Sequence, residues 1–469
     1  MRGRFAAALL SLLLLAACTR PSPGDRAGSR PVTTFKEASS FADGALPAPT
    51  PASTAAPRPA APATPPPPSP APTVTPFYTG VRSPACGQRL PLASTHADPP
   101  VTAVNPDPDA LAALETILPE SARPALRRIL SAPGTVGLAA YRVGQAAEGA
   151  YLNADAPMPL ASVVKLIHLV AYAEAVASGQ LDPDERISLD ELERFYLPGL
   201  DLGAHHRAVA ELADTDRISG EPPGVRLEEV AWMMIRHSSN AAADYLHMRL
   251  GQASIEETAV ALGLQSQTAP CPFLGQFLAM ANHTRSGSDI SAVRAYLEDP
   301  AGYGLEAMLL TDAYSRDPAF RQAEIAWHSG RYRPSIATQQ LFSESLNPQA
   351  SARDYAAVMA RLAQNGLSSR ESSFIARRIL EWPMRFRANQ ALFTNLGYKN
   401  GALPGILTTV YYAYRPGDAA PGVVALFFRD LPMPTYHRWR RDSLPHDELA
   451  RWLLAEPEAI PTLRRALAP

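Results

Sequence analysis

The sequence predicts a mixed α/β fold. Two strand candidates, 135–143 and 149–153, precede a long stretch with mainly helical periodicity. Three further strand candidates, 395–399, 405–414 and 423–429, follow that stretch and are rich in β-branched or aromatic residues. Helices and strands therefore both contribute to the globular part of the chain.

Length and charge limit the classes of function. The chain has 469 residues, of which 46% are hydrophobic and 19% charged, enough for one large domain or two smaller ones. Its 43 basic and 45 acidic residues give a net charge of -2. Because no basic excess is present, the composition does not indicate nucleic acid or an anionic membrane surface as a partner.

Residues 1–18 have the pattern of an export signal. Arg2 and Arg4 give a positive start, and residues 5–15 an apolar core too short to span a bilayer. The end of this segment, LAAC at 15–18, resembles the lipobox of bacterial lipoproteins. That resemblance implies cleavage before Cys18, acylation of its sulfur, and a membrane-anchored lipoprotein facing the periplasm or the cell exterior. The alternatives are a plain signal peptide with a fortuitous cysteine and a short membrane anchor.

Residues 19–105 have the composition of a disordered tether. Pro, Ala, Ser and Thr dominate, and 13 of the 30 residues from 47 to 76 are proline. Such a segment has little apolar surface to offset its conformational entropy, so we expect an extended, partly polyproline II chain. The remaining residues, 106–469, form the predicted globular domain.

The three cysteines are Cys18, Cys86 and Cys271. With Cys18 assigned to a lipid, an exported protein is left with one pair, which an oxidising compartment favours joining. We therefore expect a disulfide between Cys86 and Cys271 that attaches the end of the tether to the globular domain. The alternative is two free thiols.

The apolar spacing gives the helices in chain order. A first helix is expected over 107–130, and the break around Gly144 suits a hairpin between the first two strands. Residues 265–347 mix an apolar run with helical stretches, and we interpret them as a helical elaboration, a candidate lid. Further helices are expected at 166–176, 227–235, 241–250, 352–365, 372–380, 446–454 and 461–467.

A serine and a lysine three residues apart, Ser162 and Lys165, stand just before the helix at 166–176. If Ser162 opens this helix, the Lys165 amine lies one turn on and on the same face as the hydroxyl. A serine hydroxyl needs an adjacent base to attack at neutral pH, and a desolvated lysine can be that base. The alternative is a helix N-cap with a solvated lysine.

Residues 187–227 show no clear periodicity and are expected to be irregular. They contain His205 and His206, but no carboxylate or third histidine stands at metal-ligand spacing, so we expect a surface loop. His237, just before Ser238, has two interpretations: a proton carrier, or a residue that packs or faces solvent. No metal or other cofactor is expected.

Three short motifs stand in a fixed order: SVVK at 162–165, SSN at 238–240 and KNG at 399–401. With two strands before the first motif, and two strands plus a helix after the last, this order resembles that of the class A serine β-lactamases and the related penicillin-binding proteins. The resemblance covers the chain from about residue 107 onward. It implies an antiparallel sheet with helices on both sides, an inserted all-helical domain, and a site in the cleft between them.

The resemblance also implies roles for the reactive side chains. Ser162 would attack a β-lactam or peptide carbonyl and become acylated, while Lys165 takes its proton. Ser238 would relay that proton to the leaving nitrogen, helped by the charge of Lys399. Asn240 would bind the amide carbonyl of the substrate and steady Lys165.

The oxyanion hole would consist of the backbone N–H groups of Ser162 and Ala402, and Gly401 would allow the strand to approach closely. Two positions depart from the family pattern. Ser239 replaces the usual aspartate, which is largely structural. Asn400 replaces the threonine or serine whose hydroxyl helps to hold the substrate carboxylate, which puts the specificity in doubt.

The sequence lacks the family's usual motif for a deacylation base. Class A enzymes carry a glutamate in Glu-x-x-Leu-Asn that activates the hydrolytic water. The nearest string is SESLN at 343–347, with serine in the place of the glutamate and Glu344 one residue late. Glu344 is therefore a candidate base, with a surface carboxylate as the alternative. Without a base the acyl-enzyme would persist, as in a penicillin-binding protein.

Three functional hypotheses follow. The first is a β-lactamase-like serine hydrolase that is acylated at Ser162 and turns over. The second acts on peptidoglycan-like peptides as a carboxypeptidase or transpeptidase. The third is a monomeric wall-binding lipoprotein without catalysis, against which the intact reactive positions count. The first two are also expected to be monomers that take a small β-lactam or peptide-like substrate.

Overall fold

Five strands form one antiparallel sheet in the order β2-β1-β9-β8-β7. They are β1 (Val136–Arg142), β2 (Ala150–Leu152), β7 (Asn395–Leu403), β8 (Ile406–Tyr414) and β9 (Gly422–Phe428). Val136 at the start of β1 pairs with Phe428 at the end of β9, so early and late parts of the chain meet inside the sheet. The mixed fold and the antiparallel sheet are confirmed.

The computed structural model describes residues 86–90, 104–284, 290–330, 334–442 and 444–467. The predicted export signal, Cys18 and the tether up to residue 85 lie outside the described residues. Within the described ranges, no helix has both the length and the apolar character needed to cross a membrane.

Both faces of the sheet are covered, which explains why the central strand β9 is apolar at every position but its first. Val423, Ala425 and Phe427 belong to the core shared with the helical part of the molecule. Their neighbours Val424, Leu426 and Phe428 point to the opposite face, because successive side chains of a strand alternate. Each face therefore has its own buried core.

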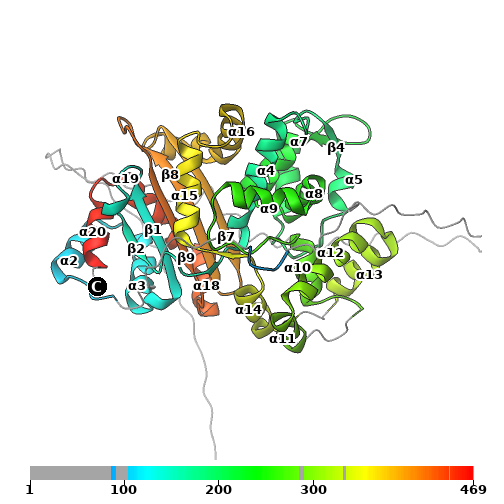
Figure 1. The fold of residues 1–469 in the computed structure, drawn as a ribbon, viewed down its shortest axis with the longest axis horizontal. Helices are drawn as coiled ribbons and strands as arrows, with labels where there is room; N and C mark the ends of the chain where they lie inside the picture. Colours follow the sequence, from blue (N-terminus) through cyan, green and yellow to red (C-terminus); the bar gives the residue numbers. More distant parts are fainter. Residues whose placement is uncertain (1–85, 91–103, 285–289, 331–333, 443, 468–469) are drawn as a thin grey trace, which may run out of the picture. The chain divides into compact units, whose positions relative to one another are not determined.

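The first core lies under α15 (Ala352–Ala363), which crosses the sheet over β1, β8 and β9 (Figure 1). The second core lies under helices from the N-terminal and C-terminal parts of the domain. Its helices are α2 (Pro108–Ile117), α3 (Arg123–Ser131), α19 (Pro445–Ala455) and α20 (Ala459–Ala466). The helical periodicity over 107–130 thus corresponds to two α-helices with a break between them. Pro119 has no N–H to continue the helix, and Leu118 before it is extended.

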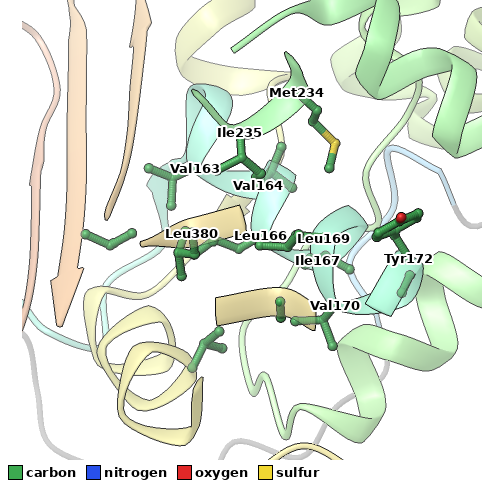
Figure 2. Close-up of a cluster of buried hydrophobic side chains, with 14 of the residues drawn as sticks. Val163, Val164, Leu166, Ile167, Leu169, Val170, Tyr172, Met234, Ile235 and Leu380 are labelled. Carbon is green, nitrogen blue, oxygen red and sulfur yellow. The ribbon is translucent and has the colours of Figure 1, made fainter. Parts of the chain in front are cut away.

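The all-helical part is built around α4 (Lys165–Ala177), in which 10 of the 13 residues are buried. Its helices include α7 (Leu227–Trp232), α8 (Asn240–Leu250), α9 (Gln252–Ala261) and α16 (Arg370–Leu380). Figure 2 shows the cluster that fixes α4 and the turn before it. Its labelled members are Val163, Val164, Leu166, Ile167, Leu169, Val170, Tyr172, Met234, Ile235 and Leu380.

The stretch 187–227 is more regular than the sequence indicated. It contains the ends of the ribbon β4 (Arg186–Ser188) with β5 (Gly224–Arg226), and the helices α5 (Leu189–Glu193) and α6 (Ala204–Asp214). The buried side of α6 consists mainly of Ala204, His205, Ala208 and Leu212, a helical spacing hidden by small residues and a histidine. The expectation of a surface loop at His205 is therefore wrong, because His205 is buried in α6.

The described parts of residues 265–347 contain five helices beside the α4 core (Figure 1). They are α10 (Phe273–Met280), α11 (Ile290–Glu298), α12 (Pro300–Arg316), α13 (Pro318–Ser329) and α14 (Ile336–Ser345). A disulfide joins Cys86 to Cys271 and holds residues 86–90 against this part. The short ribbon of β3 (Met158–Pro159) and β6 (Gln349–Ala350) then leads the chain back to α15.

Three further helices of the described chain were not predicted: α9, α17 (Arg387–Gln390) and α18 (Met433–Asp442). Most of α18 is polar, and among its described side chains only Tyr436 and Trp439 are buried, so its apolar periodicity rests on one i,i+3 pair.

We expect Leu169→Ala to lower the free energy of unfolding by about 3–5 kcal/mol, because Leu169 is fully buried on α4 and its removal leaves a cavity. Urea denaturation followed by circular dichroism measures the change. The matched control is Leu309→Ala on α12, where the leucine is 60% exposed and the change should stay within about 0.5 kcal/mol. Equal effects of the two substitutions would contradict this description of the core.

Candidate active site

Ser162 lies in a tight turn, Ala161–Val164, that leads directly into α4. Ala161 before it has a φ of 47°, in the left-handed region that is uncommon for residues other than glycine. Two side chains from distant segments hold this turn. Asn347 Oδ1 accepts from the Ala161 N–H at 2.9 Å, and the Thr408 hydroxyl donates to the Leu160 carbonyl at 2.8 Å. The strained turn is thus fixed by its surroundings.

The Lys165 amine is fully buried beside this serine. Its Nζ lies 3.1 Å from Ser162 Oγ, 2.6 Å from the Ser238 carbonyl oxygen and 3.3 Å from Ser238 Oγ. The side-chain oxygen of Asn240 lies 2.7 Å from the same nitrogen. The first two motifs therefore meet at one amine, which lies within hydrogen-bonding distance of the Ser162 hydroxyl.

Ser238 connects this amine to the third motif. It follows the wide helical turn Met233–His237 and has a φ of 65°, which separates that turn from α8. Its hydroxyl oxygen accepts from the Lys399 ammonium at 3.0 Å. The Ser238 hydroxyl therefore lies between two lysine side chains, Lys165 and Lys399, both of them buried.

Ser239 points away from the reactive side chains and is fully buried. Its hydroxyl oxygen accepts from the Ala242 N–H at 3.1 Å and so caps α8, whose first residue is Asn240. The His205 ring lies 3.0 Å from the same oxygen. Both residues thus help to position Asn240 through the start of α8.

Lys399, Asn400, Gly401 and Ala402 lie on β7, the edge strand of the sheet. This edge approaches the Ser162 turn very closely. A Cβ on Gly401 would lie 2.6 Å from the Ser162 backbone nitrogen and 2.8 Å from the Ala161 Cβ. Only glycine fits there without displacing the turn. This close approach explains why a glycine stands at position 401.

Burial dominates the electrostatics of the two lysines. It lowers the pKa of Lys165 to about 7, and the negative charges of Asp201 and Asp244 oppose that shift. Burial also lowers the pKa of Lys399 well below its usual value, with a further contribution from the charge of Lys165, while Asp447 opposes it. A substantial fraction of Lys165 is therefore neutral near pH 7.

The site opens into a cleft of about 510 Å³ between the sheet and the helical part. The sheet side of its lining includes Asn400, Gly401 and Ala402, and the helical side Ser162, Ser238 and Asn240. Further lining residues are Asp201, Arg207, Arg236, His237, Phe273, Trp382, His437, Arg440 and His446. Basic side chains thus outnumber Asp201, the one carboxylate among these described lining residues.

His237 lines the cleft, but its side chain is committed elsewhere. The ring nitrogen Nε2 lies 2.8 Å from a Glu211 carboxylate oxygen. Burial and the charge of Arg236 lower the pKa of His237 to about 4, with Glu211 opposing. The imidazole of His237 is therefore neutral at pH 7 and held by Glu211. Of the two interpretations, this favours a packed residue over a proton carrier.

Phe273, the first residue of α10, covers one side of the Lys165 amine, with Nζ 4.4 Å from the centre of its ring. Asp244, buried below, accepts from the N–H groups of Phe273 and Leu274 at 2.6 and 2.7 Å. Burial raises the pKa of Asp244 to about 7. Both of its oxygens are occupied by backbone donors.

Glu344 lies elsewhere. Its carboxylate forms an ion pair with Arg429, and it is not among the described residues that line the cleft. Burial raises its pKa, with the charge of Arg429 opposing. Ser343, in the place of the family's glutamate, is buried as well. The string 343–347 does reach the site, but through Asn347 at the Ala161 N–H. This placement gives no support to Glu344 as a base.

The arrangement has the groups that acyl transfer needs: a hydroxyl, a base with lowered pKa, a second hydroxyl beside another lysine, and a strand edge close to the Ser162 N–H. Within the described ranges, no set of three or more His, Cys, Asp or Glu side chains is placed to hold a metal ion. Phe273, Asp244, Asp201 and the residues of α18 were not predicted as parts of the site. Only their positions in the fold bring them to the site.

Comparison with known proteins places this geometry in a family. Residues 121–431, more than half of the chain, match the model of the beta-lactamase enzyme family, Beta-lactamase2. No curated protein sequence matches the chain.

Similar solved structures include a beta-lactamase from Sphaerobacter thermophilus, with 19% identity over 74% of this chain and 96% of that one, at a TM-score of 0.41. PBP-A, with 16% identity, is matched over 77% and 97% at a TM-score of 0.39. A class A beta-lactamase from Mycobacterium abscessus has 15% identity over 74% and 98% at a TM-score of 0.42. The match to the family model decides the assignment, and the chain belongs to the beta-lactamase enzyme family.

Proposed function

We propose that this protein is a serine hydrolase that is acylated at Ser162 by β-lactams or related cell-wall amides. The observation that carries the proposal is the set of short contacts around Lys165, whose amine reaches Ser162, Ser238 and Asn240. Its lowered pKa makes it a base at neutral pH.

The hydrogen-bond capacity of a neutral amine supports Lys165 as the base. Such an amine has two N–H donors and one lone pair. Its two shortest contacts are to the carbonyl oxygens of Ser238 and Asn240, which accept only. If these take the two protons, the lone pair remains for the hydroxyl proton of Ser162, 3.1 Å away.

The reaction then follows with balanced proton transfers. Ser162 Oγ attacks the carbonyl carbon as Lys165 takes its proton, and the carbonyl oxygen becomes an oxyanion between the N–H groups of Ser162 and Ala402. Lys165 passes a proton through the Ser238 hydroxyl to the leaving nitrogen as the C–N bond breaks. The Lys399 ammonium beside Ser238 favours this transfer. Loss of one oxyanion donor typically costs about 2.7–4 kcal/mol of transition-state stabilisation.

Slow hydrolysis, as in a penicillin-binding protein acting on peptides, is the second candidate function. It is favoured by Phe273, which places a ring rather than a carboxylate over Lys165, and by the pairing of Glu344 with Arg429. Asp244 is a poor candidate for that base, because it is fully buried and is not among the described residues that line the cleft.

A fluorescent penicillin should label the protein covalently, and Ser162→Ala should abolish the labelling. The matched control Ser178→Ala, at the other end of α4, should label normally. Denaturing gels and intact mass spectrometry measure the adduct. We expect the label to persist for many minutes after free penicillin is removed. Loss within seconds would instead indicate efficient turnover, and labelling of Ser162→Ala would refute the assigned nucleophile.

The acylation rate should rise with pH through about 7 and level off above it, because Lys165 acts as a base only when it has lost its proton. Stopped-flow labelling between pH 5 and 9 gives the profile. Asp201→Asn removes a negative charge that raises the pKa of Lys165, so the rise should move to lower pH. A flat profile, or a shift to higher pH in this variant, would contradict Lys165 as the base.

We also propose that Cys18 carries a lipid that anchors the protein outside a bacterial membrane, as its resemblance to a lipobox implies. Cys18→Ser should move the protein from the membrane to the soluble fraction in cell fractionation. Thr19→Ser, next to it, should leave the protein with the membranes. Unchanged partitioning of Cys18→Ser would refute the lipid anchor.

A further inference from the structure

Glu211 on α6 holds the wide helical turn Met233–His237 that leads to Ser238. Its carboxylate oxygen Oε2 accepts from Arg236 Nε at 2.9 Å and lies 2.7 Å from Arg236 Nη2. The same oxygen lies 2.8 Å from His237 Nε2. The Glu211 side chain is 16% exposed and its two partners less, so solvent screens these contacts only weakly. Glu211 therefore binds the two residues that come directly before Ser238.

Glu211 also reaches a segment that packs against the edge of the sheet. Its second oxygen, Oε1, forms an ion pair with Arg385, in the turn that begins at Trp382. That turn packs against β7, and the centre of the Trp382 ring lies 5.8 Å from that of Tyr398, the residue before Lys399. One carboxylate thus connects α6 with the segments that lead to the second and third motifs.

The Arg236 guanidinium strengthens this connection. It lies 4.8 Å from the centre of the Trp382 ring and 5.5 Å from that of Trp232, both within the range of cation–π contacts. Although burial raises the pKa of Glu211, the hydrogen bonds from Arg236 and Arg385 lower it to about 2. The carboxylate is therefore charged at neutral pH and holds both arginines.

The position of Ser238 has little tolerance. Its φ of 65° lies in the left-handed region, which a residue other than glycine keeps only where its surroundings fix it. Its hydroxyl oxygen lies 3.3 Å from Lys165 Nζ and 3.0 Å from Lys399 Nζ. Since a hydrogen bond is lost beyond about 3.5 Å, a displacement of about 0.5 Å is enough to break one of these two contacts.

We infer that Glu211 is a positioning residue for the proton relay to the leaving nitrogen, because it holds the segments on both sides of the contact between Ser238 and Lys399. This inference rests on the proposed function and specifies how the site is held for one step. Ser162 and Lys165 lie on one continuous turn and helix, so their own contact does not run through Glu211. Loss of Glu211 should therefore impair cleavage of the C–N bond and leave substrate binding largely unchanged.

The leaving group of the substrate distinguishes this role from a general loss of structure. An amine leaves with a proton, which the relay supplies, whereas a thiolate takes the electron pair of the C–S bond and leaves without one. Benzylpenicillin therefore needs the relay, and the thioester N-benzoyl-D-alanyl-thioglycolate does not. Rapid-quench mass spectrometry of the Ser162 adduct gives the limiting acylation rate and the half-saturating concentration for both substrates.

Glu211→Gln should lower the limiting rate with benzylpenicillin about tenfold, since a misplacement of about 1 Å can cost about a hundredfold. The half-saturating concentration should change less than about twofold, as expected for an interaction that acts only in the transition state. With the thioester the limiting rate should fall less than about threefold, because its leaving group needs no general acid.

The matched control is Glu229→Gln. Glu229 is also buried and accepts from Arg217 and Arg226 at 2.8 Å each, so this variant should lose comparable stability in thermal unfolding without a selective loss for benzylpenicillin. Arg385→Gln removes only the partner beside β7, from a half-exposed side chain, and should show the selective loss to a smaller extent. It provides the same comparison if Glu211→Gln does not fold.

Equal slowing of both substrates, an unchanged rate with benzylpenicillin, or the same selective loss in Glu229→Gln would overturn the role of Glu211. Failure of the proposed function looks different: the unsubstituted protein would then form no adduct with either substrate, which would overturn the acylation and this inference with it.

Discussion

The buried amine of Lys165 is the interaction on which the site depends. A charged amine without water is unfavourable unless acceptors surround it, and here Ser162, Ser238 and Asn240 supply them. These acceptors come from two segments more than seventy positions apart. The left-handed conformations at Ala161 and Ser238 bring them together, so backbone strain is concentrated where the amine must be held.

In the proposed reaction, the same burial affects the formation of an acyl-enzyme and its hydrolysis differently. Attack by Ser162 needs only the lone pair of Lys165, which lies within reach of the Ser162 hydroxyl. Hydrolysis also needs a water molecule and a base on the ester. The ring of Phe273 occupies one approach to the amine, and Glu344 is held by Arg429. The packing that lowers the pKa of the lysine therefore also limits the access of water to it.

The three motifs and the five strands could be predicted from the sequence because each has a strong local signal. Alternation and β-branched residues mark strands, and Ser162 with Lys165 follows helical spacing. Local sequence patterns did not predict the elements and contacts whose burial depends on residues distant in the sequence. His205 in α6 has small apolar neighbours, and α18 buries only two aromatic residues. Phe273 reaches Lys165 from a segment more than a hundred residues away, through contacts that no local pattern records.

The pairing of β1 with β9 has a consequence for the order of synthesis. The Ser162 turn is synthesised before most of the domain. The strand that approaches it, β7, and the central strand β9 are synthesised only near the end of the chain. A nascent or truncated chain lacks the sheet edge that closes on Ser162, and contacts over such sequence distances form slowly. The proposed reactivity of Ser162 toward acyl donors therefore requires the domain to be nearly complete.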